Sequence, residues 1–212
     1  MAEYRLYCMG ESGNAYKAAL MLELCRLPWE PVWVDFFHGE TRTADFRGNL
    51  NEMGEVPVLE HAGKRLSQSG VILDYLASVT GQFGGGNDDE RREIWRWILF
   101  DNHKFTASLA TLRYLIQYAK TGETPVTEFL RARAINALKI VEHHLEDRPF
   151  VTGARPTIAD LSMMGYLFYG DELTVPLEDF PKIGGWMGRV KALPGWKHPY
   201  DIMPSAPGKA GR

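Results

Sequence analysis

Short strand-like and helix-like segments alternate over the first eighty residues of the chain, and this alternation constrains the fold more than any other feature. The predicted elements are, in order, a strand at 4–9, a helix at 15–25, a strand at 29–37, a short helix within 43–50, strands at 56–60 and 65–67, and a helix from Ser69 to Gly81. The order β-α-β-α-β-β-α predicts an α/β domain that contains one small sheet with a terminal hairpin.

The rest of the chain reads as helical. Gln82–Asp89 contains three glycines and two acidic residues, which cannot be buried in a core and which predict a linker. Apolar residues then recur at helical spacing from Ile94 to Ile116 and again from Val126 to Leu145, and further helices are predicted from Thr157 and near Lys182. We therefore expect an α/β domain at 1–80, a linker at 81–89 and an all-α domain at 90–212.

Composition excludes several classes of protein. Hydrophobic residues make up 45% of the 212 residues and the net charge is -3, which fits a globular protein and argues against a nucleic-acid binder. No apolar stretch approaches the ~20 residues that span a bilayer, and the N-terminus has no signal-like apolar segment. The two cysteines, Cys8 and Cys25, cannot complete a four-ligand zinc site. These features predict a cytoplasmic protein without a metal.

Four segments together resemble the cytosolic glutathione transferases. They are Ser12-Gly13-Asn14, Glu55-Val56-Pro57-Val58-Leu59, Ser67–Leu76 and Thr157-Ile158-Ala159-Asp160-Leu161, and their order and spacing match over nearly the whole chain. The likeness is to bacterial-type members with a serine-type catalytic residue. It implies a thioredoxin-like N-terminal domain, an all-helical C-terminal domain, glutathione as co-substrate, a hydrophobic electrophile site between the domains, a homodimer and a role in detoxification.

The resemblance assigns the ends of glutathione to particular residues. Ser69, at a helix N-terminus, is expected to bind the γ-glutamyl carboxylate, which the helix dipole also favours. Gln68 replaces the acidic residue that many members carry there, so its contact with the ligand's ammonium should be weaker. The backbone of Val56 is expected to pair with the cysteinyl peptide, and His38 or Arg42 is a candidate for the glycyl carboxylate.

Ser12 is the predicted catalytic residue, because a hydroxyl at the start of a helix can donate to the glutathione thiolate. Asn14 is expected to support it by orienting the loop or by contacting the sulfur. Tyr7 is the alternative, since some classes of the family use a tyrosine hydroxyl. Cys8 is a rival of another kind, because cysteine-type members form mixed disulfides, but its place within a strand predicts burial.

Other residues receive narrower predictions. Met9 and Phe105 are candidates for the hydrophobic substrate site. The Val56–Pro57 bond is expected to be cis, from its place before the third strand. Thr157 and Asp160 have the spacing of a capping box, which is a folding role. His143 and His144 diverge on a helix, so we expect no metal site there.

Three functions are compatible with the sequence. The leading one is transfer of the glutathione thiolate to small hydrophobic electrophiles. A glutathione-dependent disulfide reductase or peroxidase on the same scaffold is the second, and a non-catalytic interaction protein that retained the fold is the third. The Ser12–Asn14 and Gln68–Ser69 segments argue against the third.

Overall fold

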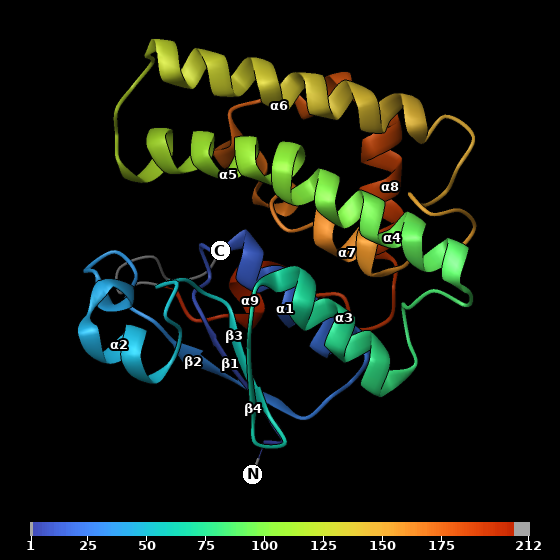
Figure 1. The fold of residues 1–212 in the computed structure, drawn as a ribbon. Coiled ribbons are helices and arrows are strands. Elements are labelled where there is room, and N and C mark those ends of the chain that lie inside the picture. The colour runs from blue at the N-terminus through green and yellow to red at the C-terminus, as the bar shows by residue number, and fades with distance from the viewer. Residues whose placement is uncertain (1, 206–212) are drawn as a thin grey trace. The chain divides into compact units, whose positions relative to one another are not determined.

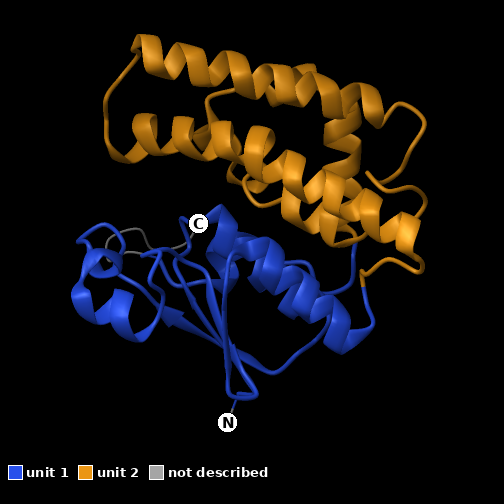
Figure 2. Ribbon diagram, viewed as in Figure 1, with its two compact units in different colours: residues 1–82, 193–212 blue, residues 83–192 orange. Residues whose placement is uncertain are grey.

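The computed structural model describes residues 2–205 and divides the chain into two compact units (Figures 1 and 2). Among the described residues, unit 1 comprises 2–82 and 193–205, and unit 2 runs from Phe83 to Ala192. The sequence placed the segment 193–205 with the helical domain. It groups with unit 1 because the Tyr16 hydroxyl donates to the Lys197 carbonyl at 2.8 Å and the Gly10 N–H donates to the Pro204 carbonyl at 2.7 Å.

Unit 1 has the predicted order of elements around one four-stranded sheet. They are β1 (Tyr4–Cys8), α1 (Gly13–Leu24), β2 (Trp29–Trp33), α2 (Ala44–Asn49), β3 (Val58–His61), β4 (Lys64–Ser67), α3 (Ser69–Thr80) and, near the C-terminus, α9 (Pro199–Ile202). The strand order is β2-β1-β3-β4, with β1 parallel to β2 and antiparallel to β3. β2 is shorter than predicted, because the Phe36 N–H bonds to the Val34 carbonyl at 3.0 Å and turns the chain away from the ladder.

The two faces of the sheet differ in what covers them. Tyr4, Leu6 and Cys8 point to a buried face, where α1 and α3 pack. On that face His61 stacks on Tyr4 at 3.8 Å between ring centroids and bonds through Nδ1 to the Tyr75 hydroxyl of α3 at 2.7 Å. The other face therefore carries the alternate residues of β1, among them Tyr7.

Unit 2 is helical, as the apolar spacing predicts. Its helices are α4 (Asp88–Phe100), α5 (Thr106–Arg113), α6 (Pro125–His144), α7 (Ile158–Met163) and α8 (Pro181–Lys191), with π-helical turns at Asp101–Phe105 and Tyr114–Tyr118 and 3₁₀ turns at Leu167–Leu173 and Leu177–Asp179. The thioredoxin-like α/β domain followed by a helical domain is confirmed. Among the described residues, no helix is both long and apolar enough to cross a membrane.

The start of α6 departs from the predicted buried stripe. Val126 and Phe129 are 59% and 58% exposed, while Thr127 and Ala134 are fully buried. The stripe that faces the core thus starts one position later than the apolar residues suggest, because the small Thr127 packs inward under the N-cap Thr124. Val126 and Phe129 are therefore left on the surface at the start of α6.

The Asp160 carboxylate accepts hydrogen bonds from three segments of unit 2. Its Oδ2 accepts the Thr157 N–H at 2.8 Å, which completes the predicted capping box. Its Oδ1 accepts the Val151 N–H and the Trp186 indole N–H, each at 2.9 Å. Asp160 is fully buried, and this burial raises its pKa to about 6 despite the hydrogen bonds.

This shifted pKa predicts a pH-dependent contribution to stability. The folded chain binds the proton of Asp160 more tightly than the unfolded chain, where the pKa is ~3.9, so protonation favours folding. From pH 7 to pH 5, the free energy of unfolding of the wild type should rise by about 1 kcal/mol relative to the Asp160→Asn variant. Urea denaturation of both chains at the two pH values measures the difference. A constant difference would contradict the shifted pKa.

Candidate functional site

The loops that carry the predicted glutathione residues leave the sheet at the same end. Tyr7, near the end of β1, pairs with Val58 at the start of β3, and Val58 pairs with Ser67 at the end of β4. The loop after β1, the loop before β3 and the loop after β4 therefore meet at one end of unit 1. They contain Ser12, the Val56–Pro57 bond and the Gln68–Ser69 pair, respectively.

Ser12 is the N-cap of α1. Its Oγ accepts the Ala15 N–H at 3.1 Å, and its backbone has extended dihedral angles. A hydroxyl has one proton and two lone pairs, so capping leaves its O–H available to donate. Ser12 is half-buried at the positive end of the helix dipole, where an anion is favoured. Capping the helix and donating to a thiolate are thus compatible roles. Asn14, also half-buried, is the second residue of α1.

The N-terminus of α3 presents an anion-binding geometry. The N-cap is Gln68, not Ser69, and its side chain makes no capping bond. Gln68 has φ 67°, a left-handed conformation that costs about 1–3 kcal/mol in a residue other than glycine. Within residues 2–205 the Ser69 hydroxyl has no hydrogen-bond partner, although Ser69 is only 6% exposed. The first turn therefore offers a hydroxyl and backbone N–H groups to a carboxylate.

The side chain of Asn51 holds the loop before β3 through two hydrogen bonds. Asn51 Nδ2 donates to the Glu55 carbonyl at 2.9 Å, and Asn51 Oδ1 accepts the Met53 N–H at 3.1 Å. The Val56–Pro57 bond is cis, as expected. Val56 is half-buried, and none of the described residues bonds to its backbone N–H or C=O. This backbone edge is the one predicted to pair with the cysteinyl peptide.

The structure places the Tyr7 hydroxyl away from the start of α1. It lies on the sheet face opposite α1 and α3 and donates to Glu60 Oε2 at 3.2 Å. Burial and the Glu60 carboxylate raise the pKa of Tyr7. A hydroxyl with a raised pKa is a weaker donor to a thiolate, and this one already has a carboxylate as its acceptor. These observations favour Ser12 over Tyr7.

Cys8 is fully buried in β1, and burial raises the pKa of its thiol to about 12. Because the thiolate is the reactive form, Cys8 is poorly suited to form a mixed disulfide. Cys25 is half-buried and its pKa is also raised by burial.

We expect Cys8 to resist thiol reagents in the folded protein at neutral pH. Titration with an aromatic disulfide reagent should modify Cys8 only after denaturation. Rapid modification of Cys8 in the native chain, located by peptide mapping, would contradict this expectation.

The remaining predicted residues have mixed placements. His38 is largely exposed and bonds through Nδ1 to the Asp35 carboxylate at 2.8 Å. Arg42 is exposed in a 3₁₀ turn and forms no ion pair with the residues described. Met9 and Phe105 are 5% and 1% exposed and belong to different units.

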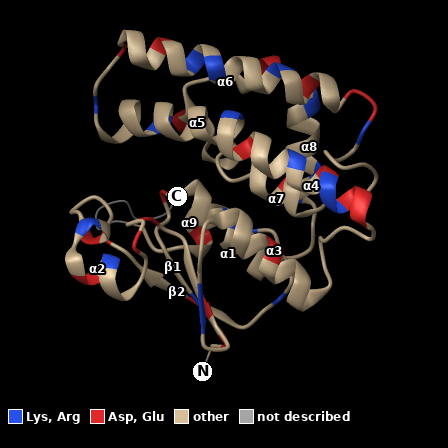
Figure 3. Ribbon diagram, viewed as in Figure 1, with Lys and Arg blue, Asp and Glu red and all other residues tan. Residues whose placement is uncertain are grey.

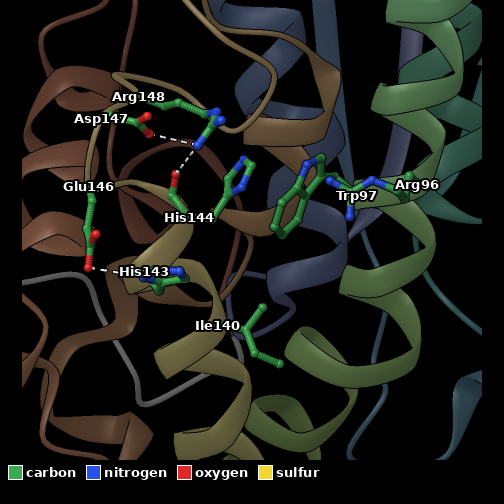
Figure 4. A pocket seen from close by; sticks show the side chains of 8 residues that line it. All are labelled: Arg96, Trp97, Ile140, His143, His144, Glu146, Asp147 and Arg148. Carbon is green, nitrogen blue, oxygen red and sulfur yellow. Dashed lines mark hydrogen bonds and ion pairs between the residues drawn. The ribbon is translucent and has the colours of Figure 1, made fainter.

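Unit 2 contains a separate depression of about 470 Å³. It is lined by Arg96, Trp97, Ile140, His143, His144, Glu146, Asp147 and Arg148 (Figure 4). His143 and His144 diverge as expected: His143 pairs with Glu146 at 3.1 Å, and His144 bonds to the Val151 carbonyl at 2.8 Å. Acidic and basic residues are interspersed along α4 and α6 (Figure 3), and no metal-binding cluster occurs among the residues that the structure describes. We assign no chemistry to this depression.

Comparison with known proteins identifies the family. The family model "Glutathione S-transferase, N-terminal domain" matches residues 12–79, and "Glutathione S-transferase, C-terminal domain" matches 106–194. A crystal structure of a possible glutathione S-transferase from Rhodopseudomonas palustris is 34% identical, with a TM-score of 0.87 over 93% of this chain and 98% of that one. The chain belongs to the glutathione S-transferase family. Glutathione S-transferase F14 of Arabidopsis thaliana is 29% identical over 93% of this chain and 81% of its own.

Glutathione itself is present in a related structure. The glutathione transferase from Burkholderia graminis, crystallised with two glutathione molecules per subunit, is 26% identical to this chain. It has a TM-score of 0.81 and covers 92% of this chain and 85% of its own.

Sequence reasoning missed one neighbour of the predicted site. Glu55 precedes Val56 in the motif and has no predicted role, yet its carboxylate accepts a hydrogen bond from Gln68. The available signal was the neutral residue at position 68, because the ammonium of glutathione would then need a negative charge from another residue.

Proposed function

We propose that this glutathione S-transferase family member binds glutathione at the start of α1 and α3 and transfers its thiolate to small hydrophobic electrophiles. The observation that supports the proposal is the strand register, which puts the loops that contain Ser12, Val56 and Ser69 at the same end of the sheet. Bacterial-type membership, serine-type catalysis and a role in detoxification are parts of the same proposal.

Each group of glutathione has a suitable partner in this arrangement. The γ-glutamyl carboxylate would bind the Ser69 hydroxyl and the N–H groups of the first turn of α3. The cysteinyl peptide would pair with the free backbone edge of Val56, as an added strand does. Arg42 is the better candidate for the glycyl carboxylate, because His38 already has a carboxylate partner.

The chemical task is to ionise the thiol. An ordinary thiol has a pKa of about 8.5, and lowering it by ~2 units requires about 2.7 kcal/mol of preferential thiolate stabilisation. The Ser12 O–H and the N-terminal dipole of α1 would supply this stabilisation together. The sulfur would then attack the electrophile.

Calorimetric titration with glutathione and a conjugation assay with a chlorinated aromatic test this function. We expect one glutathione site per chain and release of chloride with turnover. Glutathione binding combined with activity only on a mixed disulfide would favour the reductase instead. Absence of glutathione binding would contradict the proposal.

The apolar surface of α6 supports a homodimer, the state that the family resemblance implies. Phe129 and Ile140 are 58% and 45% exposed and line a cavity of about 320 Å³ together with Phe100 of α4. Lys104 and Arg133 border the same cavity. An apolar patch rimmed by polar side chains is typical of an interaction surface, and we propose a second copy of this chain as its occupant.

Placing a charge in this surface should separate the dimer. Phe129→Asp would remove the largest exposed apolar side chain of this surface and desolvate a charged carboxylate in its place, so we expect sedimentation equilibrium to show a monomer at concentrations where the wild type is a dimer. Lys139→Asp is the control, because it adds an acid on the exposed side of α6 without lining the cavity. A dimer that survives Phe129→Asp would place the interface elsewhere.

A further inference from the structure

Gln68 is neutral, so it offers no negative charge to the ammonium of glutathione. If Ser69 binds the γ-glutamyl carboxylate, the ammonium on the same carbon must lie within a few ångström of the start of α3. A cation held at a protein surface is favoured by a carboxylate more strongly than by an amide dipole. Gln68 supplies only the dipole, so either the contact is weak or a nearby residue provides the charge.

The Glu55 carboxylate contacts the side chain of Gln68, the residue next to Ser69. Gln68 Nε2 donates to Glu55 Oε2 at 3.0 Å and contacts Met53 Sδ at 3.1 Å. The amide nitrogen therefore faces the loop before β3, and the Glu55 carboxylate is one side-chain contact from the residue next to Ser69. A carboxylate can accept about four hydrogen bonds, and Gln68 uses one of them.

The loop fixes the backbone of Glu55. The Asn51 amide donates to the Glu55 carbonyl at 2.9 Å, and Asn51 is only 7% exposed. Gly54, just before it, has φ 68°, and a Cβ there would lie 2.7 Å from the Thr41 carbonyl oxygen. The backbone is therefore fixed at Gly54 and at Glu55. The Glu55 side chain starts directly beside the backbone edge of Val56.

We propose that Glu55 provides the negative charge for the ammonium of the γ-glutamyl group and that Gln68 holds its carboxylate in place. This inference rests on the proposed glutathione site. It assigns to the loop before β3 a charge that the position next to Ser69 lacks. With Glu55 in this role, the ammonium would have a carboxylate partner although residue 68 is an amide. The ligand class specified is a γ-glutamyl compound with a free α-amino group.

The test compares glutathione with glutaryl-cysteinylglycine, which lacks only the amino group. Calorimetry on the wild type should show about 10-fold or greater preference for glutathione, the range of a charge-assisted hydrogen bond. Glu55→Gln should remove this preference by weakening glutathione while leaving the analogue unchanged. Glu52→Gln, the same change at an exposed position of the same loop, should keep it.

A double variant controls for misfolding of the loop in Glu55→Gln. The double variant Glu55→Gln with Gln68→Glu swaps the amide and the carboxylate and conserves both their contact and the net charge, so it should restore the preference for glutathione. Retention of the preference in Glu55→Gln would overturn the inference while leaving the glutathione site intact. A wild type that binds glutathione and the analogue equally would also overturn it. A wild type that binds neither would overturn the proposed function together with it.

Discussion

Replacing Ser69 by alanine should weaken glutathione binding about 10- to 150-fold, because a hydrogen bond to a charged carboxylate contributes ~1.5–3 kcal/mol. The Ser69 hydroxyl does not cap α3, and no described residue bonds to it, so the substitution removes little from the folded chain itself. The loss should appear as a raised KM for glutathione with a smaller change in kcat. Calorimetric titration gives the affinity directly.

Ser78→Ala provides the matched control. Ser78 is an exposed serine of the same helix, and its hydroxyl donates to the Tyr75 carbonyl at 2.7 Å. Its replacement should leave glutathione affinity within about twofold of the wild type, since exposed substitutions of this kind have small effects. If a folded Ser69→Ala variant binds glutathione as tightly as the control, Ser69 does not belong to the site.

Replacing Ser12 by alanine should lower kcat/KM about 10- to 100-fold while glutathione affinity changes little, because the role we propose for the hydroxyl is to donate to the ionised sulfur. The substitution also removes the N-cap of α1, at a cost of ~1 kcal/mol in stability. Ser12→Gly separates the two effects, since glycine at an N-cap costs only a few tenths of a kcal/mol relative to serine. We expect equal losses of activity in the alanine and glycine variants.

Two further variants complete this comparison. Ser12→Thr keeps both the cap and the hydroxyl and should recover much of the activity. Tyr7→Phe should have little effect, because the Tyr7 hydroxyl is engaged by Glu60 on the other face of the sheet. A larger loss in Tyr7→Phe than in Ser12→Ala would transfer the thiolate role to Tyr7. No loss in either would favour Asn14 or the backbone N–H groups of α1.

Local chemistry and periodicity were enough to predict the order of elements in unit 1 and the capping box of Asp160. Both depend on residues close together in the chain. The surface exposure of Phe129 was not predictable, because an apolar residue at helical spacing looks the same whether it packs inward or forms an interface. Thr127 packs into the core and leaves Phe129 on the surface. Because Thr127 is polar, the pattern of apolar residues does not include it.

Contacts between segments that are far apart in the sequence were the hardest to predict. The segment from Leu193 returns to unit 1 through backbone acceptors, Lys197 O and Pro204 O, and a carbonyl is present at every position in the sequence. The contact between Glu55 and Gln68 joins residues thirteen apart across the β3–β4 hairpin. Both segments belong to the predicted motifs. The contact between these two side chains, however, depends on the register of the hairpin.

The central claim is that Ser12 holds bound glutathione as a thiolate, and titration of the ultraviolet thiolate absorbance against pH in the wild-type and Ser12→Ala complexes tests it most directly. In the wild type we expect a midpoint ~2 units below the ordinary thiol pKa of about 8.5. In Ser12→Ala the midpoint should rise by about 1 unit, which corresponds to ~1.4 kcal/mol of lost thiolate stabilisation. A wild-type midpoint equal to that of free glutathione, or the same lowered midpoint in both complexes, would contradict it.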